Sequence, residues 1–151
     1  MIFVTVGTEK FDELVKKMDE IALDLGEKVT IQIGKGRYEP KNCKYFRIAL
    51  DLAQYYEKAD LIVAHGGAGT IFELLGKNRK IIGISNPEKP GQHQEDILKA
   101  LSRQNYLIWC KDLNRLKEAI KNTKETKIKE YQKPECKIAE TITKRLSEWF
   151  R

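Results

Sequence analysis

The sequence has few of the residues and motifs that several protein classes need. Its three cysteines, Cys43, Cys110 and Cys136, are odd in number and far apart, and no CxxC pair occurs. A zinc site is therefore not expected, and we predict no metal site of any kind. No apolar run approaches the roughly 18 residues that a transmembrane helix needs, so none is predicted.

The start of the chain lacks the charged segment and the long apolar stretch of a signal peptide, because Met1–Val4 lead directly into a predicted strand. We therefore expect a cytoplasmic protein whose thiols are reduced. The 151 residues, of which 41% are hydrophobic, suffice for the core of one domain with a tail.

Two common nucleotide-binding motifs are also missing. The pattern GxGxxG is absent after the first predicted strand, where Gly7 is followed by Thr8, Glu9 and Lys10. The P-loop pattern GxxxxGK[ST] is absent as well, which disfavours ATP hydrolysis. A phosphate site in this chain would have to be built in another way.

Positive charge is concentrated near the C-terminus. The formal net charge is +6, and residues 111–151 hold 12 basic residues against 7 acidic ones. Such a segment is either a solvated, lysine-rich helical surface or a region that faces anionic lipid, an acidic partner or nucleic acid. Nucleic acid is the weakest of these alternatives and is not predicted, because no stacking aromatic residues interleave with the lysines.

Short apolar runs alternate with helical patterns along the chain. This alternation predicts an α/β fold, a doubly wound, Rossmann-like parallel sheet with right-handed crossovers. Six strands suggest the order 3-2-1-4-5-6, in which strands one and four are neighbours at the switch point where ligands bind. The predicted strands are Ile2–Val6, Val29–Ile33, Tyr45–Ile48, Leu61–Ala64, Ile81–Ile84 and Tyr106–Trp109. The predicted helices are Phe11–Leu25, Leu52–Lys58, Thr70–Gly76, residues 92–103 and Leu113–Lys121.

The C-terminal part has a different pattern. Residues 122–134 are polar and lack strong periodicity, and Pro134 precedes a last, amphipathic helix. Its apolar stripe either packs on its own domain or docks on another protein. The stripe consists of Ile138, Ile142, Leu146 and Trp149. We therefore predict a Rossmann-like domain over residues 1–121 and a linker with a C-terminal helix over residues 122–151, available for docking a partner.

A glycine turn between the fourth strand and the next helix is the most informative motif. The strand is followed by His65, Gly66, Gly67, Ala68, Gly69 and Thr70. Glycines let the backbone approach a ligand closely, and a helix N-terminus offers unpaired N–H groups and a partial positive charge. One glycine would indicate only a tight turn, but three before a helix favour a phosphate site. The loop Gly7–Thr8 after strand one leads to the same crevice.

Other polar positions near this crevice suit a sugar or a ribose. Glu73 lies on what is predicted to be the first helical turn, where its carboxylate would bind a ribose diol or cap the helix together with Thr70. The tetrapeptide Gln92–Glu95 opens a helix after a Pro/Gly loop, and such side chains suit sugar hydroxyls. The alternative for the tetrapeptide is the ordinary polarity of a helix start.

Two further features leave alternatives open. His65 is a candidate catalytic base, but an imidazole at a strand end more often holds loops together. The segment Gly34–Arg37 offers cations near the end of the second strand, or it is only a loop.

Together these segments resemble the C-terminal, nucleotide-sugar-binding half of GT-B glycosyltransferases of the family 28 type. HGGAGTIFELL at 65–75, GKNRKIIGISN at 76–86 and GQHQED at 91–96 follow that family's order of phosphate loop, ribose glutamate and glutamine-bearing sugar loop. MIFVTVGT at 1–8 is similar to stand-alone donor-binding subunits, a group that includes a eukaryotic UDP-N-acetylglucosamine transferase subunit of the dolichol-linked pathway and bacterial exopolysaccharide subunits. The chain departs from the family at residues 78–80, where a proline is common, and at Glu95.

The resemblance implies a role for each matching position. The diphosphate would be held by Gly7 and Thr8 and by the turn, Gly66, Gly67, Ala68, Gly69 and Thr70. Glu73 would bind the ribose. The donor sugar would contact Gln94, with Glu95 and His93, and the uracil would lie near the loop after residues 45–48.

The resemblance also implies a function. One GT-B half lacks the acceptor-binding domain, so the chain would be the donor-binding, catalytic subunit of a two-subunit inverting glycosyltransferase. It would transfer a hexosyl group, GlcNAc by analogy, from a UDP-sugar to a lipid-linked acceptor. A membrane-attached partner subunit would bind that acceptor and hold the complex at the cytoplasmic membrane face.

No cofactor or metal is implied, because the sequence has no DxD motif and a helix N-terminus can stabilise the departing diphosphate. One alternative is a non-catalytic, nucleotide-sugar-binding enhancer subunit. Another is a UDP-sugar epimerase-like enzyme, which the short chain disfavours because that fold usually pairs two such domains.

Overall fold

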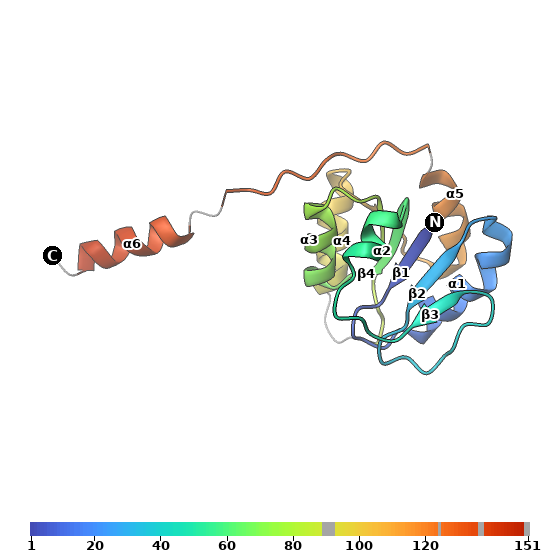
Figure 1. Ribbon diagram of the computed structural model, residues 1–151. Coiled ribbons are helices and arrows are strands. Elements are labelled where there is room, and N and C mark those ends of the chain that lie inside the picture. The colour runs from blue at the N-terminus through green and yellow to red at the C-terminus, as the bar shows by residue number, and fades with distance from the viewer. Residues whose placement is uncertain (89–92, 124, 136–137, 150–151) are drawn as a thin grey trace.

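The chain forms one six-stranded parallel sheet flanked by helices on both faces (Figure 1). The computed structural model describes residues 1–88, 93–123, 125–135 and 138–149. The strand order is β3-β2-β1-β4-β5-β6, which confirms the predicted doubly wound fold. The strands are β1 (Ile2–Thr5), β2 (Val29–Gln32), β3 (Lys44–Phe46), β4 (Leu61–His65), β5 (Ile81–Ile84) and β6 (Ile108–Trp109).

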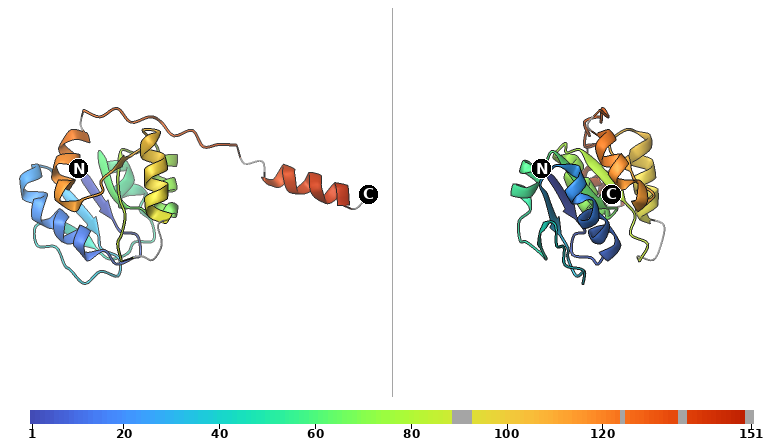
Figure 2. Two further views of the ribbon diagram at one scale, coloured as in Figure 1. Left: turned by 180° about the vertical axis from the view of Figure 1, so that it is seen from behind. Right: turned by 90° about the vertical axis from the view of Figure 1, so that its right-hand side faces the viewer.

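The helices divide between the two faces of the sheet. One face carries α1 (Asp12–Leu25) and α5 (Leu116–Thr123), and the other carries α2 (Ala53–Lys58), α3 (Ala68–Gly76) and α4 (His93–Arg103). Figures 1 and 2 show α3 and α4 on one side of the strands and α1 and α5 on the other. Each face of the sheet has its own hydrophobic core. Because side chains alternate along a strand, Val4 packs against the face that carries α1 and α5, and its neighbour Phe3 packs against the opposite face.

Several predicted boundaries shift in the structure. The helical run Thr70–Gly76 extends two residues further toward the N-terminus, because α3 begins at Ala68 with Gly67 as its N-cap. The helix predicted over Leu113–Lys121 opens with a 3₁₀ turn, η1 (Leu113–Arg115), that precedes α5. Asp112 caps this turn, its carboxylate accepting from Asn114 N at 2.9 Å.

Residues 34–43, between β2 and β3, have no regular structure and are held by the carboxylate of Asp19 on α1. Asp19 is 1% exposed and accepts hydrogen bonds from Asn42 N at 2.7 Å, Lys41 N at 3.0 Å and the Tyr38 hydroxyl at 2.9 Å. Burial would raise the pKa of this carboxyl, but these hydrogen bonds outweigh it and hold the pKa below its ordinary value. Burial and the nearby Asp19 charge raise the pKa of the Cys43 thiol to about 12.

The chain after α5 first crosses the body and then leaves it. Tyr131 N donates to Asn78 Oδ1 at 3.1 Å, and the Tyr131 ring contacts Phe72 and Tyr106. Beyond this contact, α6 (Ile138–Trp149) lies apart from the sheet and its flanking helices, as Figure 1 and the left view of Figure 2 show. Its stripe residues Ile138, Ile142 and Leu146 are 65%, 53% and 44% exposed. No helix among the described residues is long and apolar enough to span a membrane.

We predict that Asp19→Asn lowers the free energy of unfolding at pH 7 by about 2–3 kcal/mol, because an amide replaces a carboxylate that accepts from several donors. The folded pKa of Asp19 lies below its unfolded value of about 3.9. The contribution of Asp19 to the free energy of unfolding is therefore fully present above that unfolded value, and it is lost as the pH falls through the folded pKa. Urea unfolding from pH 7 down to pH 3 measures the free energy of unfolding of both proteins. The difference between wild type and variant should become smaller below about pH 4.

Asp24→Asn is the matched control, because Asp24 lies on the same helix and its carboxylate forms an exposed pair with Lys117 at 2.6 Å. A surface pair contributes little, so this variant should unfold close to the wild type. An equal loss in both variants, or a gap for Asp19→Asn that stays constant with pH, would contradict the assignment.

Candidate functional site

The parallel pairing of β1 with β4 brings the two glycine loops together. Thr5 lies in register with Ala64, so the turns that follow the two strands leave the sheet side by side. The two predicted phosphate loops therefore meet at the switch point of the sheet. Buried polar side chains lie beneath them, since Thr5 Oγ1 donates to Gln32 Oε1 at 2.6 Å and accepts from Gly7 N at 3.0 Å.

The imidazole of His65 fills the space between the two loops. His65 is 6% exposed. A Cβ added at Gly7 would lie 3.0 Å from His65 Cε1, and one added at Gly67 would overlap His65 Nε2. Gly7 also has a φ of +61°, in the left-handed region that favours glycine. The missing side chains of Gly7 and Gly67 thus make room for the ring, which fits the loop-holding role; the catalytic role of His65 stays a prediction.

The N-terminus of α3 faces open space. Its N-cap, Gly67, has an extended conformation, and among the described residues no side chain caps the helix. Ala68 and Gly69 are exposed, Thr70 is half-buried, and nothing lies within 4 Å of the position of a Cβ on Gly69. The first N–H groups and the positive end of the helix dipole are therefore accessible to an anion.

Glu73 lies on the second turn of α3, not the first, because the helix begins at Ala68. This rules out the predicted alternative in which Thr70 is the N-cap and Glu73 its capping partner. Thr70 and Glu73 are three positions apart and so share one side of the helix. The Glu73 side chain is exposed, and burial together with the Glu73 charge raises the pKa of Tyr56 on α2 to about 12.

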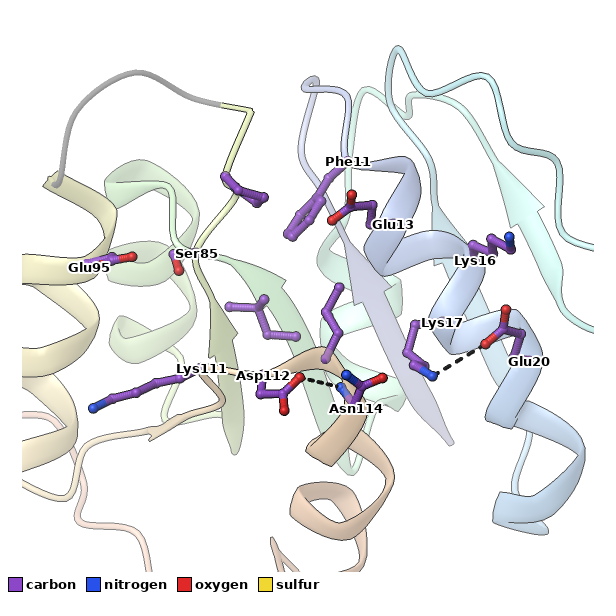
Figure 3. A pocket seen from close by; sticks show the side chains of 13 residues that line it. Phe11, Glu13, Lys16, Lys17, Glu20, Ser85, Glu95, Lys111, Asp112 and Asn114 are labelled. Atoms are coloured by element: carbon purple, nitrogen blue, oxygen red, sulfur yellow. Dashed lines mark hydrogen bonds and ion pairs between the residues drawn. The ribbon is translucent and has the colours of Figure 1, made fainter.

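The sugar-loop residues divide between two places. Gln94 on α4 lies against the glycine turn, because a Cβ on Gly66 would lie 3.0 Å from Gln94 Cβ. Glu95 instead lines a cavity of about 620 Å³ between α1, the chain after β5, and residues 111–114 (Figure 3). His93 is exposed. Gln92 lies outside the described residues.

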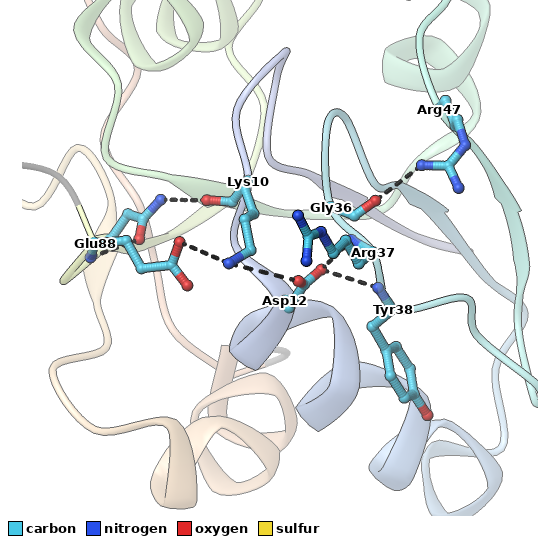
Figure 4. Close-up of polar contacts among 8 residues, drawn as sticks. Lys10, Asp12, Gly36, Arg37, Tyr38, Arg47 and Glu88 are labelled. Atoms are coloured by element: carbon cyan, nitrogen blue, oxygen red, sulfur yellow. Dashed lines mark hydrogen bonds and ion pairs between the residues drawn. The ribbon is translucent and has the colours of Figure 1, made fainter.

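The segment Gly34–Arg37 braces the loop after β1 through its backbone. Lys35 N donates to Glu9 O at 3.1 Å, and a Cβ on Gly34, whose φ is +54°, would overlap the same carbonyl. The Asp12 carboxylate accepts from Arg37 N at 2.8 Å, and Figure 4 shows it between that segment and Lys10. The side chains of Lys35 and Arg37 are exposed.

Asn86, just after β5, lies beside the candidate site, and no motif in the sequence marks it. It is 4% exposed, and its Nδ2 donates to Lys10 O at 2.7 Å, which links the loop after β5 to the loop after β1. The only sequence signal was a polar residue directly after a buried strand at the edge where ligands bind. Within the described residues, no group of three His, Cys, Asp or Glu side chains could hold a metal ion.

The fold and the glycine turn define a Rossmann-like domain with an open helix N-terminus at its switch point. The family model of the glycosyltransferase family 28 C-terminal domain matches residues 1–148. The chain therefore belongs to this family.

Curated relatives and solved structures agree with this assignment. The chain is 32% identical over 121 residues to the mouse UDP-N-acetylglucosamine transferase subunit ALG13, covering 72% of this chain and 10% of that protein. The human subunit is 29% identical over 125 residues, which cover 72% of this chain and 11% of the human protein. The chain thus spans about a tenth of the length of these relatives.

Two solved structures have the same fold. One is MurG from Acinetobacter baumannii, with a TM-score of 0.64 and 20% identity over 82% of this chain and 41% of that one. The other is the solution structure of ALG13, with a TM-score of 0.61 and 18% identity over 87% of this chain and 89% of that one.

We predict that Gly67→Ala destabilises the protein by about 1–3 kcal/mol, because the new methyl group displaces the buried His65 ring. Gly69→Ala is the control within the same turn. Its Cβ meets nothing within 4 Å and it lies inside α3, so alanine should keep the stability or raise it by up to about 1 kcal/mol. Urea denaturation of the two variants measures the difference, and equal stabilities would contradict the packing role of His65.

Proposed function

We propose that this chain is the donor-binding, catalytic subunit of a two-subunit inverting glycosyltransferase that uses a UDP-sugar, UDP-GlcNAc by analogy with the ALG13 relatives. The observation that carries the proposal is the open, uncapped N-terminus of α3 at the switch point, beside the loop after β1. A negatively charged diphosphate fits that position because N–H groups and a helix dipole converge there. No cofactor takes part in the proposed reaction.

The proposed chemistry is a displacement at the anomeric carbon of the donor sugar. An acceptor hydroxyl oxygen forms the new bond to that carbon from the opposite face, the bond to the phosphate oxygen breaks, and UDP leaves with the electron pair. The charge that develops on the leaving oxygen is stabilised by the N–H groups of Ala68, Gly69 and Thr70. The acceptor proton passes to a base.

The remaining donor contacts follow from positions around the turn. Glu73 is exposed on the same side of α3 as Thr70, so it would accept hydrogen bonds from the ribose hydroxyls next to the diphosphate. Gln94 lies beside Gly66 and would contact the sugar. Glu95 and His93 would contact it only if the donor extends toward the cavity after β5.

The acceptor proton needs a base. His65 is the candidate within the domain, but its ring is buried between Gly7 and Gly67. A base on a partner subunit, which also binds a lipid-linked acceptor, fits a chain that forms one Rossmann-like domain. The exposed stripe of α6 is the proposed docking element for that membrane-attached partner, and it would place the complex at the cytoplasmic face of the membrane.

We predict that Glu73→Ala weakens binding of UDP and UDP-GlcNAc by roughly 10–100-fold, the loss expected for hydrogen bonds to a charged group. Calorimetry with UDP, UDP-GlcNAc, UDP-glucose and ADP measures both the loss and the uridine preference of the wild type. Glu118→Ala on α5 is the control, because Glu118 forms only an exposed pair with Arg115 at 3.5 Å on the other face of the sheet.

Three results would count against the proposal. They are the absence of uridine preference in the wild type, equal binding by the Glu73 and Glu118 variants, and sugar transfer by the purified chain alone. If Glu73→Ala abolished donor binding but left the basal activity of the partner intact, the chain would be an enhancer subunit rather than a catalytic one.

A second prediction concerns α6. Membranes from cells that lack the chain should regain transfer of labelled GlcNAc from UDP-GlcNAc to lipid when the purified chain is added. Ile142→Asp should abolish this recovery while leaving UDP binding unchanged, because it places a charge in the exposed apolar stripe. Ser147→Asp adds the same charge on the opposite side of the helix and should restore transfer like the wild type. Recovery by both variants would show that the stripe docks nothing.

A further inference from the structure

Asn86 occupies the centre of a hydrogen-bond network in the loop after β5. Its side chain donates to Lys10 O at 2.7 Å and accepts from Glu88 N at 3.0 Å, so both ends of the amide are used. With 4% exposure, the side chain is shielded from water that could replace these bonds. The position of the Asn86 peptide is therefore fixed relative to the loop after β1.

That peptide in turn holds Gln94. The backbone N–H of Asn86 donates to Gln94 Oε1 at 2.8 Å. A backbone N–H is a donor only, so the atom of Gln94 that faces it must be the carbonyl oxygen and not the amide nitrogen. The Gln94 amide is thus oriented with its oxygen toward the loop.

The orientation of the Gln94 amide determines which of its hydrogen-bonding groups can contact a ligand. With Oε1 engaged, the two N–H groups of Nε2 remain for other partners. They can bind only an acceptor, such as a hydroxyl or carbonyl oxygen of a sugar. Gln94 Cβ lies beside Gly66, so these donors are positioned next to the turn that would hold the diphosphate.

We propose that Asn86 is a positioning residue that, through its own backbone N–H, turns Gln94 so that it presents N–H donors to an oxygen of the donor sugar. This inference rests on the proposed function, because it concerns the same UDP-sugar site. It adds a residue outside the glycine turn and assigns a direction to a hydrogen bond. The link from Asn86 to Lys10 also means that the sugar-contacting residue and the loop after β1 are held as one unit.

The test compares the dissociation constants for UDP-GlcNAc and UDP by calorimetry in each variant. The ratio of the two constants isolates the sugar contact, because both ligands carry the uridine and the diphosphate. Gln94→Glu keeps an oxygen for the Asn86 N–H but has no N–H to donate. Asn86→Ala keeps the Gln94 side chain but releases the loop that orients it.

Both variants should raise the ratio of the UDP-GlcNAc constant to the UDP constant by about tenfold, the loss of roughly one hydrogen bond. Asn86→Ala combined with Gln94→Ala should raise the ratio no further than Gln94→Ala alone, because the two residues act through one contact. Asn42→Ala is the control: Asn42 also bonds by its side chain to a backbone oxygen, that of Asp19 at 3.2 Å, away from the site, and its ratio should stay at the wild-type value.

Three other results would overturn the proposed role of Asn86 or the contact that it orients. If Asn86→Ala weakens both ligands equally, Asn86 only maintains the loop and the positioning role is overturned. If Gln94→Glu leaves the ratio unchanged, the assigned direction of the hydrogen bond is wrong. If the wild type binds neither ligand, the proposed function fails and this inference fails with it.

Discussion

The parallel pairing of β1 with β4 is the constraint on which the rest of the site depends. The winding of the chain reverses between these two strands, so no helix crosses from one to the other and the loops beyond them are left facing each other. Helices then cover both faces of the sheet, and a ligand can approach only at its edge. The positions of the two glycine loops follow from that arrangement.

The two glycine loops are spaced by a side chain packed between them. One buried imidazole, His65, separates two loops that have no side chains at Gly7 and Gly67, and Gly66 lets α4 approach the turn. The absence of side chains at these glycines therefore has two effects. It leaves space for the His65 ring and for α4, and it leaves the first N–H groups of α3 uncovered. A larger side chain at any of these three positions would displace neighbouring side chains even when no ligand is bound.

The part of the chain beyond α5 connects this domain to α6. Tyr131 attaches the segment to the C-terminal ends of α3 and α4, near Asn78 and Tyr106, before the chain leaves the body. The same helix α3 therefore carries the candidate phosphate site at one end and the attachment of the C-terminal segment at the other. Residues 124–151, beyond α5, hold 8 basic residues against 5 acidic ones, so part of the excess positive charge lies on this outgoing segment.

The fold class, the strand order and the meeting of the two glycine loops could all be predicted from the amino-acid sequence. Apolar runs alternating with helical patterns leave few topologies, and glycines before a helix mark a close backbone approach. The sequence did not determine where α3 begins, that Asp19 holds the loop before β3, or that Asn86 orients Gln94. These depend on contacts between residues such as Asn86 and Lys10, which lie far apart in the chain. Local patterns report periodicity and turn chemistry, whereas the partner of a buried polar group is decided only when the sheet brings distant loops together.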